Sequence, residues 1–586
     1  MLEDENKTNS KIKLEEIELN PERTSFENKL RRKNTKEDID FYFDTINEIK
    51  VLGWENKLSE SKLPIRDLRG LNDAEILNTE FDDVKTMKII NGDIDRTRVK
   101  ESIYMTSYKE YLAKLIVYYI KSNKISYKQG LNEIAGPFIL LKYKFKISFT
   151  RIYKLLVYFI DKFLTNYYLE KDFYSLRSSF GLIHLLLKYH DPELFRRFEY
   201  ALITPDLYAT SWILTLFGNK SELNVIYYFW DKLILFDDNL FTFFFITAFL
   251  IINRDKFFDG DYASILTELC QLNITTIKEV NEILNLANEL RNKTPNSFYL
   301  LANELEIFNY DSKNLKDLYE HFKLDEMLAM PLYPSDLFFI THKNFIHCPD
   351  INCENFQSEN ITNWSNCFYC GNRNSKNKMS FIILDIRIFD REIYDNELKV
   401  KNEDNSINDL FPGFLPISIR ITLEQLNSKE FPKNILNEYE KEKEKYHFII
   451  ITSDTDNYFE FENYFYKYTN NKKSIKGVNI KRPRELDLKK VEEAFEENEN
   501  KRDYYLLKEF DYFKKLIEEM NLQQFKYVSF AYGGYKKIHA FAMKYKIDLL
   551  EHGKKCFLCE EEEKMKNRKF SFLSYFFDND KKLFNK

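Results

Sequence analysis

Two short motifs in the first third of the chain carry side chains that could act on a phosphate group. The first, Ile90–Thr97 (INGDIDRT), places Asp93 three residues before Arg96, and the second, Tyr127–Asn132 (YKQGLN), contains Gln129. A guanidinium keeps its charge and spans two oxygens with a planar fork. An amide can accept a hydrogen bond from water and donate one to a phosphate oxygen. We expect Asp93 to hold Arg96 through a charge-assisted hydrogen bond.

Each motif also has a structural interpretation. An isolated arginine such as Arg96 is typically a solvated cation at a helix end. Gln129-Gly130 could be a helix end followed by a turn, and Asp93 could be a helix N-cap. A third block downstream, Thr204–Phe217 (TPDLYATSWILTLF), includes Trp212, which we assign to the core. The order of the three blocks on one helical background favours the chemical interpretation.

The cysteines suggest a metal site. Six of the seven fall in close pairs: Cys348/Cys353, Cys367/Cys370 and Cys556/Cys559. Two such pairs suit tetrahedral, structural Zn²⁺. The first set predicted is Cys348, Cys353, Cys367 and Cys370. The alternative set is Cys367, Cys370, Cys556 and Cys559, in which case Cys348 and Cys353 would need His342 or His347, or would be thiols without a metal.

The elements that position these residues divide the chain into segments. Residues 1–45 are polar and expected to be mobile. From 46 to 325, apolar residues recur at helical spacing, which predicts an all-α domain. A cysteine-rich segment (342–377) follows, and then strand-like runs at 381–389, 447–453 and 526–531 alternate with helical stretches. This alternation predicts a parallel sheet in an α/β domain, 378–552, with a charged insertion at 471–525 and a tail at 553–586.

Composition excludes several classes of protein. The net charge of −6, from 87 basic and 93 acidic side chains, argues against a nucleic-acid binder. The charged N-terminus has no apolar core and is not a signal peptide. The most apolar run, Leu240 to Asn253, is shorter than the ~20 residues that a bilayer span needs. We therefore expect a cytoplasmic protein whose membrane contacts are peripheral.

On all three blocks, the helical segment resembles the TBC domain of Rab GTPase-activating proteins. The resemblance implies a Rab-family GTPase as partner, which would bring its own GTP and Mg²⁺. It also implies that Arg96 is an arginine finger and Gln129 a glutamine finger. Tyr127, Gly130 and Asn132 would shape the loop that presents Gln129.

The α/β segment resembles the rhodanese domain more loosely, on Ile383–Arg387 (ILDIR), Phe414–Arg420 (FLPISIR) and Ala531–Tyr535 (AYGGY). Rhodanese chemistry needs a cysteine thiolate in a loop of backbone N–H groups, yet Ser453 stands at the position of that loop. We therefore expect an inactive scaffold in which Asp385 and Arg387 have structural roles.

The combination of domains is similar to the TBC–rhodanese adaptors that capture golgin-tethered vesicles at the trans-Golgi. The resemblance implies a multidomain protein in Golgi and endosome traffic, recruited to membranes peripherally. The favoured function is GTPase activation. The alternative is a non-catalytic adaptor that bridges vesicles and golgin-type tethers or other trafficking proteins.

Overall fold

The computed structural model of the chain describes residues 42–60, 68, 70–102, 107–341, 380–388, 412–455, 501–554, 556–559 and 562–563. Most of the expected mobile N-terminus (1–45) and all of the cysteine-rich segment (342–377) lie outside these residues. So does the C-terminal tail beyond residue 563.

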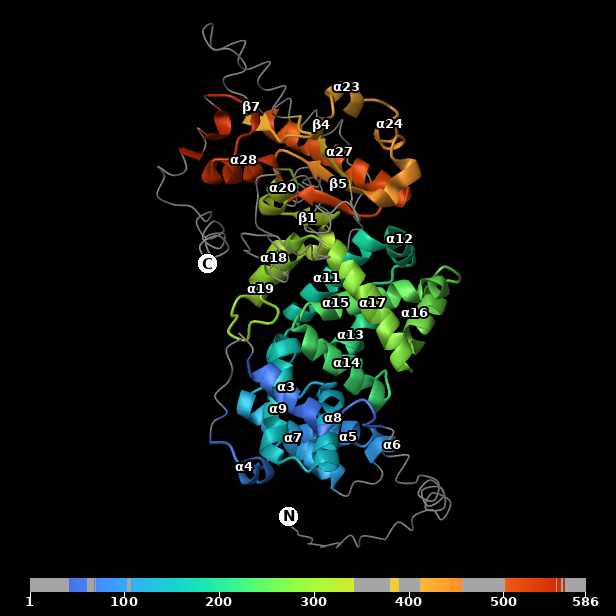
Figure 1. The fold of residues 1–586 in the computed structure, drawn as a ribbon, viewed down its shortest axis with the longest axis vertical. Helices are drawn as coiled ribbons and strands as arrows, with labels where there is room; N and C mark the ends of the chain where they lie inside the picture. The colour runs from blue at the N-terminus through green and yellow to red at the C-terminus, as the bar shows by residue number, and fades with distance from the viewer. Residues whose placement is uncertain are drawn as a thin grey trace, which may run out of the picture.

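The first half of the described chain is helical (Figure 1). Its elements are α3 (Glu48–Ser59), α4 (Asp73–Leu77), α5 (Val84–Ile94), α6 (Val99–Ser102), α7 (Tyr108–Asn123), α8 (Leu131–Phe145), α9 (Phe149–Phe163), α10 (Thr165–Leu169), α11 (Tyr174–His190), α12 (Pro192–Ala201), α13 (Pro205–Thr215), α14 (Leu223–Phe236), α15 (Phe241–Ile252), η1 (Arg254–Phe257), α16 (Tyr262–Gln271), α17 (Ile277–Lys293), α18 (Asn296–Glu304), α19 (Leu315–Phe322) and η2 (Leu324–Glu326).

Local sequence signals explain where these helices begin. Pro192 and Pro205 are the first residues of α12 and α13. Proline is common at this position because the first backbone nitrogens of a helix donate no intrahelical hydrogen bond, so its missing N–H costs nothing there. Thr276 and Glu279 form a reciprocal capping box at the start of α17. The apolar run predicted to be too short for a bilayer is α15, whose residues from Phe241 to Leu250 are all buried in the core. Within the described residues, no helix is long and apolar enough to cross a membrane.

The second half is built on a parallel sheet. Its elements are β1 (Met330–Leu332), α20 (Pro334–Thr341), β2 (Ser380–Asp385), β3 (Pro412–Phe414), β4 (Ser418–Arg420), α23 (Leu423–Leu426), α24 (Lys433–Leu436), η4 (Glu440–Lys445), β5 (Tyr446–Ile451), α27 (Lys501–Leu522), β6 (Val528–Ala531), α28 (Gly534–Tyr545) and β7 (Leu550–His552). Among the described strands, five pair in the order β1-β6-β5-β2-β4, all parallel, and β3 pairs with β7 antiparallel.

Both faces of the five-stranded sheet are covered, as parallel sheets require. Along β5, Phe448 and Ile450 point to one face, where they join the core formed with α27. Ile449 and Ile451 point to the other face, where they join a core with α20 and α28. This alternation follows from the two-residue period of a strand. The strands predicted near 381–389, 447–453 and 526–531 are β2, β5 and β6.

Two features differ from the sequence-based expectation. The sheet begins before residue 378, because β1 directly follows the helical half and pairs with β6. Part of the expected charged insertion, 471–525, is α27, an integral helix of the α/β half. Its apolar residues recur at helical spacing and pack on the sheet despite the many charges between them: Phe510, Phe513, Leu516, Ile517 and Met520.

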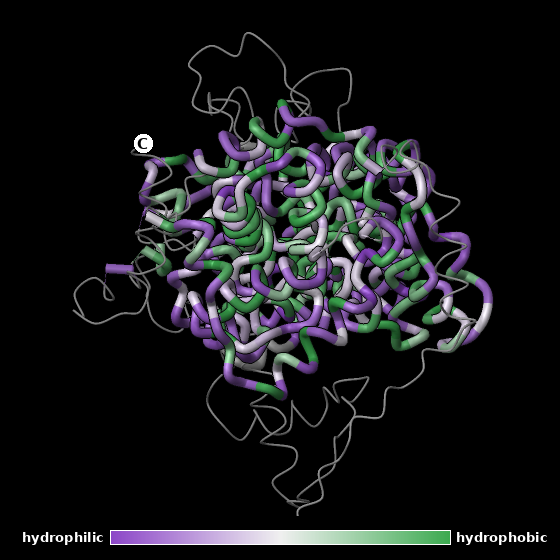
Figure 2. The backbone as a smooth tube through the Cα atoms, turned by 90° about the horizontal axis from the view of Figure 1, so that it is seen from below, coloured by the Kyte–Doolittle hydropathy of each residue, from purple (hydrophilic) through white to green (hydrophobic). Residues whose placement is uncertain are grey.

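The two halves share a packed junction. The backbone N–H of Tyr527, just before β6, donates to the carbonyl of Tyr189 at the end of α11, 3.0 Å away. The rings of these two tyrosines meet edge to face. His190 contacts both rings, and His447 contacts the ring of Tyr189. In a view from below, many hydrophilic segments lie along the outline and hydrophobic stretches lie nearer the centre (Figure 2).

Candidate functional site

The first motif lies at the C-terminal end of α5. Asp83 caps the start of this helix by accepting from the backbone N–H groups of Lys85 and Thr86. Near its other end, the Asp93 side chain is only 3% exposed, whereas Arg96, in the turn that follows, is 67% exposed. The Arg96 guanidinium donates to the Asp93 carboxylate, which is the contact expected from the sequence. A buried carboxylate thus anchors one end of a guanidinium that stands in solvent.

The second motif joins the first through a ring of hydrogen bonds. The Tyr127 hydroxyl lies 2.8 Å from Asp93 Oδ2 and 3.2 Å from Asn132 Oδ1. Asn132 Nδ2 donates to Thr97 Oγ1 over 2.7 Å, and Thr97 donates in turn to the carbonyl of Asp93 over 2.8 Å. Burial and the adjoining Asp93 carboxylate raise the pKa of Tyr127 well above its ordinary value, so its hydroxyl stays protonated.

The loop that carries Gln129 is fixed on both sides of an exposed side chain. On one side, Asn132 Oδ1 accepts from the backbone N–H of Gly130 at 3.0 Å. On the other side lies Lys128, and Gln129 between Lys128 and Gly130 is exposed. Lys128 donates to the carbonyls of Tyr167 and Glu170, and burial lowers the pKa of its ammonium to about 8. Lys128 was not among the predicted supporting residues, because a lysine in a polar loop gives no sequence signal of burial.

Glycine is required beside Gln129 for two reasons. Gly130 has a φ of +107°, a backbone conformation that residues with a Cβ rarely adopt. A Cβ there would also lie 3.3 Å from the Tyr168 hydroxyl and 3.6 Å from Leu214 Cβ. Leu214 belongs to the third sequence block, so that block forms the wall behind the loop. Trp212 in the same block is buried in the core, as predicted.

Arg98, two residues after Arg96, has a different role. Its side chain is 7% exposed and donates to Glu101 and to the carbonyls of Gly218 and Ser221. These contacts tie the turn after α5 to the loop after α13. Arg96 is therefore the arginine of this turn that is available to a partner, and Arg98 is the one that holds the turn in place.

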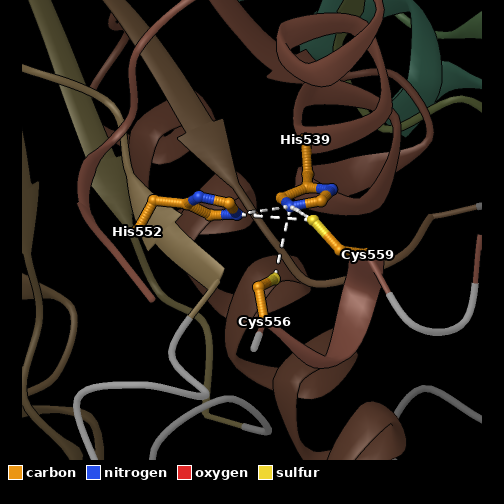
Figure 3. Close-up of side chains that lie close together, drawn as sticks. All are labelled: His539, His552, Cys556 and Cys559. Carbon is orange, nitrogen blue, oxygen red and sulfur yellow. Dashed lines mark hydrogen bonds between the residues drawn. The ribbon is translucent and has the colours of Figure 1, made fainter. Parts of the chain in front are cut away.

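The predicted metal ligands are only partly described. Cys348, Cys353, Cys367 and Cys370 all lie outside the described residues, and so do His342 and His347. Cys556 and Cys559 are described, and they lie next to His539 and His552 (Figure 3). These two histidines were not among the predicted ligands, although the spacing His552-x3-Cys556-x2-Cys559 is a signal that points to one of them.

The loop at Ser453 is bound to a carboxylate of the same chain. The Ser453 backbone N–H and hydroxyl both donate to Glu509 of α27, with the hydroxyl 2.9 Å from Glu509 Oε2. Glu509 is fully buried and also accepts from the N–H of Ile388 at 3.0 Å. Arg387 and Asp385 form a buried two-point ion pair, in keeping with the structural roles expected for them.

Residues 69–258 match the family model of the Rab-GTPase-TBC domain. Human TBC domain-containing protein kinase-like protein is 31% identical over 109 residues, which cover 19% of this chain and 12% of that protein. Human TBC1 domain family member 13 is 27% identical over 198 residues, covering 31% of this chain and 47% of that protein. The crystal structure of the Ypt/Rab-GAP domain of Gyp1p shares 20% identity at a TM-score of 0.34, covering 46% of this chain and 95% of that one.

The chain therefore spans 12% of the length of the first of these relatives and 47% of the second. The matched residues 69–258 include all three sequence blocks, with the hydrogen-bonded ring around Asp93, Tyr127 and Asn132. Residues 69–258 of this chain are thus a Rab-GTPase-TBC domain.

Proposed function

We propose that this protein is a GTPase-activating protein for a Rab-family GTPase, acting in vesicle traffic. The family match over 69–258 supports the class of partner. The observation that carries the proposal is the ring of hydrogen bonds that links the Arg96 turn to the Gln129 loop while leaving both side chains exposed. A site that acts on a partner's nucleotide must present its groups outward from a rigid support.

In this mechanism, Arg96 and Gln129 enter the nucleotide site of the partner. GTP hydrolysis builds negative charge on the transferring phosphoryl oxygens, and the Arg96 guanidinium stabilises that charge in trans. The Gln129 amide accepts from the attacking water and donates to the phosphoryl group, which holds the water in line. The GTP and Mg²⁺ belong to the partner.

The remaining residues of the ring are positioning residues. Asp93 orients Arg96, and Tyr127 fixes Asp93 from the opposite side. Asn132 fixes Gly130, and through it the backbone that carries Gln129. An exposed arginine loses much rotamer freedom when it is held in one place, so an anchor that is already in place lowers the entropy lost when the complex forms.

For the second half we propose a rhodanese-like scaffold without catalytic activity. Ser453 stands where the nucleophile would be, and the N–H of its backbone donates to Glu509 instead of facing an open anion site. This observation favours protein contacts as the function of the α/β half. It also supports the second candidate function, a non-catalytic adaptor for golgin-type tethers or other trafficking proteins. Either role places the protein in the cytoplasm, recruited peripherally to Golgi or endosomal membranes.

The two functions are separated by stimulated GTP hydrolysis across a panel of Rab proteins. We expect the wild-type chain to accelerate at least one of them. Arg96→Ala should reduce the stimulated rate by about 10³-fold or more, and Gln129→Ala by about 10²-fold or more. Arg96→Lys should also be impaired, because an ammonium lacks the two-point fork.

Lys100→Ala is the matched control, since Lys100 is an exposed cation four residues from Arg96 and should tolerate the change. If no Rab protein is stimulated by the wild-type chain, the activator function is refuted and the adaptor function is favoured. Equal activity of the wild type and both alanine variants would instead refute the assigned residues.

A further inference from the structure

Four side chains from the end of the α/β half converge on one point (Figure 3). His539 comes from α28, His552 from β7, and Cys556 and Cys559 from the turn and short helical stretch after β7. Each contributes one nitrogen or sulfur atom, and all four atoms lie within 4.8 Å of one another. Two imidazoles and two thiols grouped in this way form a ligand set preferred by Zn²⁺.

The separations match those between the ligands of one tetrahedral ion. With zinc–nitrogen bonds of about 2.0–2.1 Å and zinc–sulfur bonds of about 2.3 Å, two ligand nitrogens lie about 3.3 Å apart and nitrogen and sulfur about 3.6 Å apart. His539 Nε2 lies 3.1 Å from His552 Nε2. The sulfurs of Cys556 and Cys559 lie 3.3 and 3.6 Å from His539 Nε2, and Cys559 Sγ lies 3.6 Å from His552 Nε2.

We propose that His539, His552, Cys556 and Cys559 bind one structural Zn²⁺ ion. Four protein ligands complete a tetrahedron and leave no position for water or substrate, so the ion has no catalytic role. The set is also complete without Cys367 and Cys370. Any ion held by the cysteine pairs at 348–370 is therefore a second ion.

The surroundings of His539 fit a metal ligand. This histidine is fully buried, and its other ring nitrogen, Nδ1, lies 3.2 Å from a carboxylate oxygen of Glu562. A carboxylate that accepts from the second nitrogen fixes the tautomer and the ring orientation, as is usual for histidines that bind zinc. Cys556 is also fully buried, while Cys559 and His552 are partly exposed, which leaves a route for the ion to enter.

The ion would cross-link short elements that otherwise meet through apolar packing, since Leu549 and Leu558 share a buried cluster with α28. β7 is three residues long and pairs only with β3, itself three residues long, among the described strands. Two strands of this length are marginal on their own. Coordination ties β7 and the segment after it to α28. The first turn of α28 in turn supports the Ser453 loop, because the N–H groups of Tyr535 and Lys536 donate to the carbonyls of Thr452 and Ser453.

The test is the zinc content of the full-length chain, measured by elemental analysis after purification without chelators. We compare the wild type with the double variant His552→Ala/Cys559→Ser, which alters the two partly exposed ligands. The double variant should contain one zinc ion fewer per chain, whatever the 348–370 cysteines bind. Cys270→Ser is the matched control, since Cys270 is an exposed cysteine remote in sequence from the set, and it should leave the content unchanged.

A second variant separates loss of the metal from loss of the fold. Cys559→His keeps four ligands and should retain the ion, and the visible spectrum of its Co²⁺ form should change as one thiolate is replaced by an imidazole. Equal zinc content in the wild type and the double variant would overturn the proposal, including the case in which neither contains zinc. A Co²⁺ spectrum that is identical in the wild type and Cys559→His would also overturn it.

Discussion

Asp93→Asn tests whether the buried carboxylate contributes to GTPase activation by orienting Arg96. The substitution keeps the size and shape of the side chain and removes its charge. Asp93 is nearly inaccessible to solvent, and its two carboxylate oxygens face Arg96 and Tyr127. An asparagine can still meet one of these partners, so the ring should close in the variant. The change therefore acts mainly on the strength with which Arg96 is held.

The magnitude follows from the kind of hydrogen bond that is lost. A bond to a charged group contributes about 1.5–3 kcal/mol and a neutral one about 0.5–1.5 kcal/mol. These ranges differ by about 1–1.5 kcal/mol, and the difference is no larger here because the guanidinium of Arg96 is largely solvated. At about 1.4 kcal/mol for each factor of ten, stimulated hydrolysis should fall roughly 5- to 12-fold. The loss is well below that expected for Arg96→Ala.

The assay is single-turnover GTP hydrolysis by the Rab protein that the wild-type chain stimulates most, with Asp93→Asn, Arg96→Ala and the double variant. Because Asp93 acts through Arg96, the double variant should be no slower than Arg96→Ala alone. Asp95→Asn is the matched control, since Asp95 forms an exposed ion pair with Lys109 and should change the rate little. Additive losses in the double variant would refute the positioning role, and so would an effect of Asp95→Asn as large as that of Asp93→Asn.

Three further predictions concern stability. Gly130→Ala should lower the free energy of unfolding, measured by urea denaturation, by about 1–2 kcal/mol, because Gly130 has a positive φ and lies near the Tyr168 hydroxyl. Gly53→Ala is the control and should be neutral or stabilising, because the space around Gly53 is open. Burial lowers the pKa of His447 from 6.5 to about 3. The neutral histidine therefore contributes its full stabilisation above pH 6.5, and this contribution is lost as the pH falls toward 3. In His447→Asn, the free energy of unfolding should fall by about 2 kcal/mol less between pH 6.5 and 5 than in the wild type, and an unchanged pH profile would contradict this. Glu509→Gln should lower the free energy of unfolding by about 1–3 kcal/mol, since the amide nitrogen of glutamine cannot accept from a backbone N–H that now donates to a carboxylate oxygen. An unchanged stability by calorimetry would show that the Ser453 loop does not depend on this carboxylate.

The sequence was most informative where a chemical need restricts residue type. Arg96 and Asp93 are three residues apart, one in the turn after α5 and the other in its last turn, which makes their contact foreseeable. The contact between Asp93 and Tyr127 spans 34 positions, and no periodicity encodes it. It was foreseeable only as part of a resemblance, because the packing of α5 against α7 and α8 sets that distance.

Short elements and isolated histidines were harder to predict. β1 has three residues, Met330 to Leu332, and is a strand because β6 offers it a partner, so its own sequence carries almost no signal. His539 is in the middle of α28, thirteen positions from His552, and a single buried histidine in a helix is more often a core residue than a ligand. The approach of β7 to α28 in space identifies the pair.

The junction between the halves bears on both proposed functions. β1 continues directly from the helical half, and the N–H of Tyr527 donates to Tyr189 at the end of α11. Tyr527 also belongs to the same buried cluster as the core of the TBC domain. The sheet therefore cannot rotate against the helices without breaking this backbone hydrogen bond and separating packed aromatic rings. A partner bound to the α/β half would be held at one orientation to the Arg96 turn and the Gln129 loop. Under the proposed function, the scaffold would therefore set the direction from which a Rab protein meets the two side chains, without taking part in the chemistry.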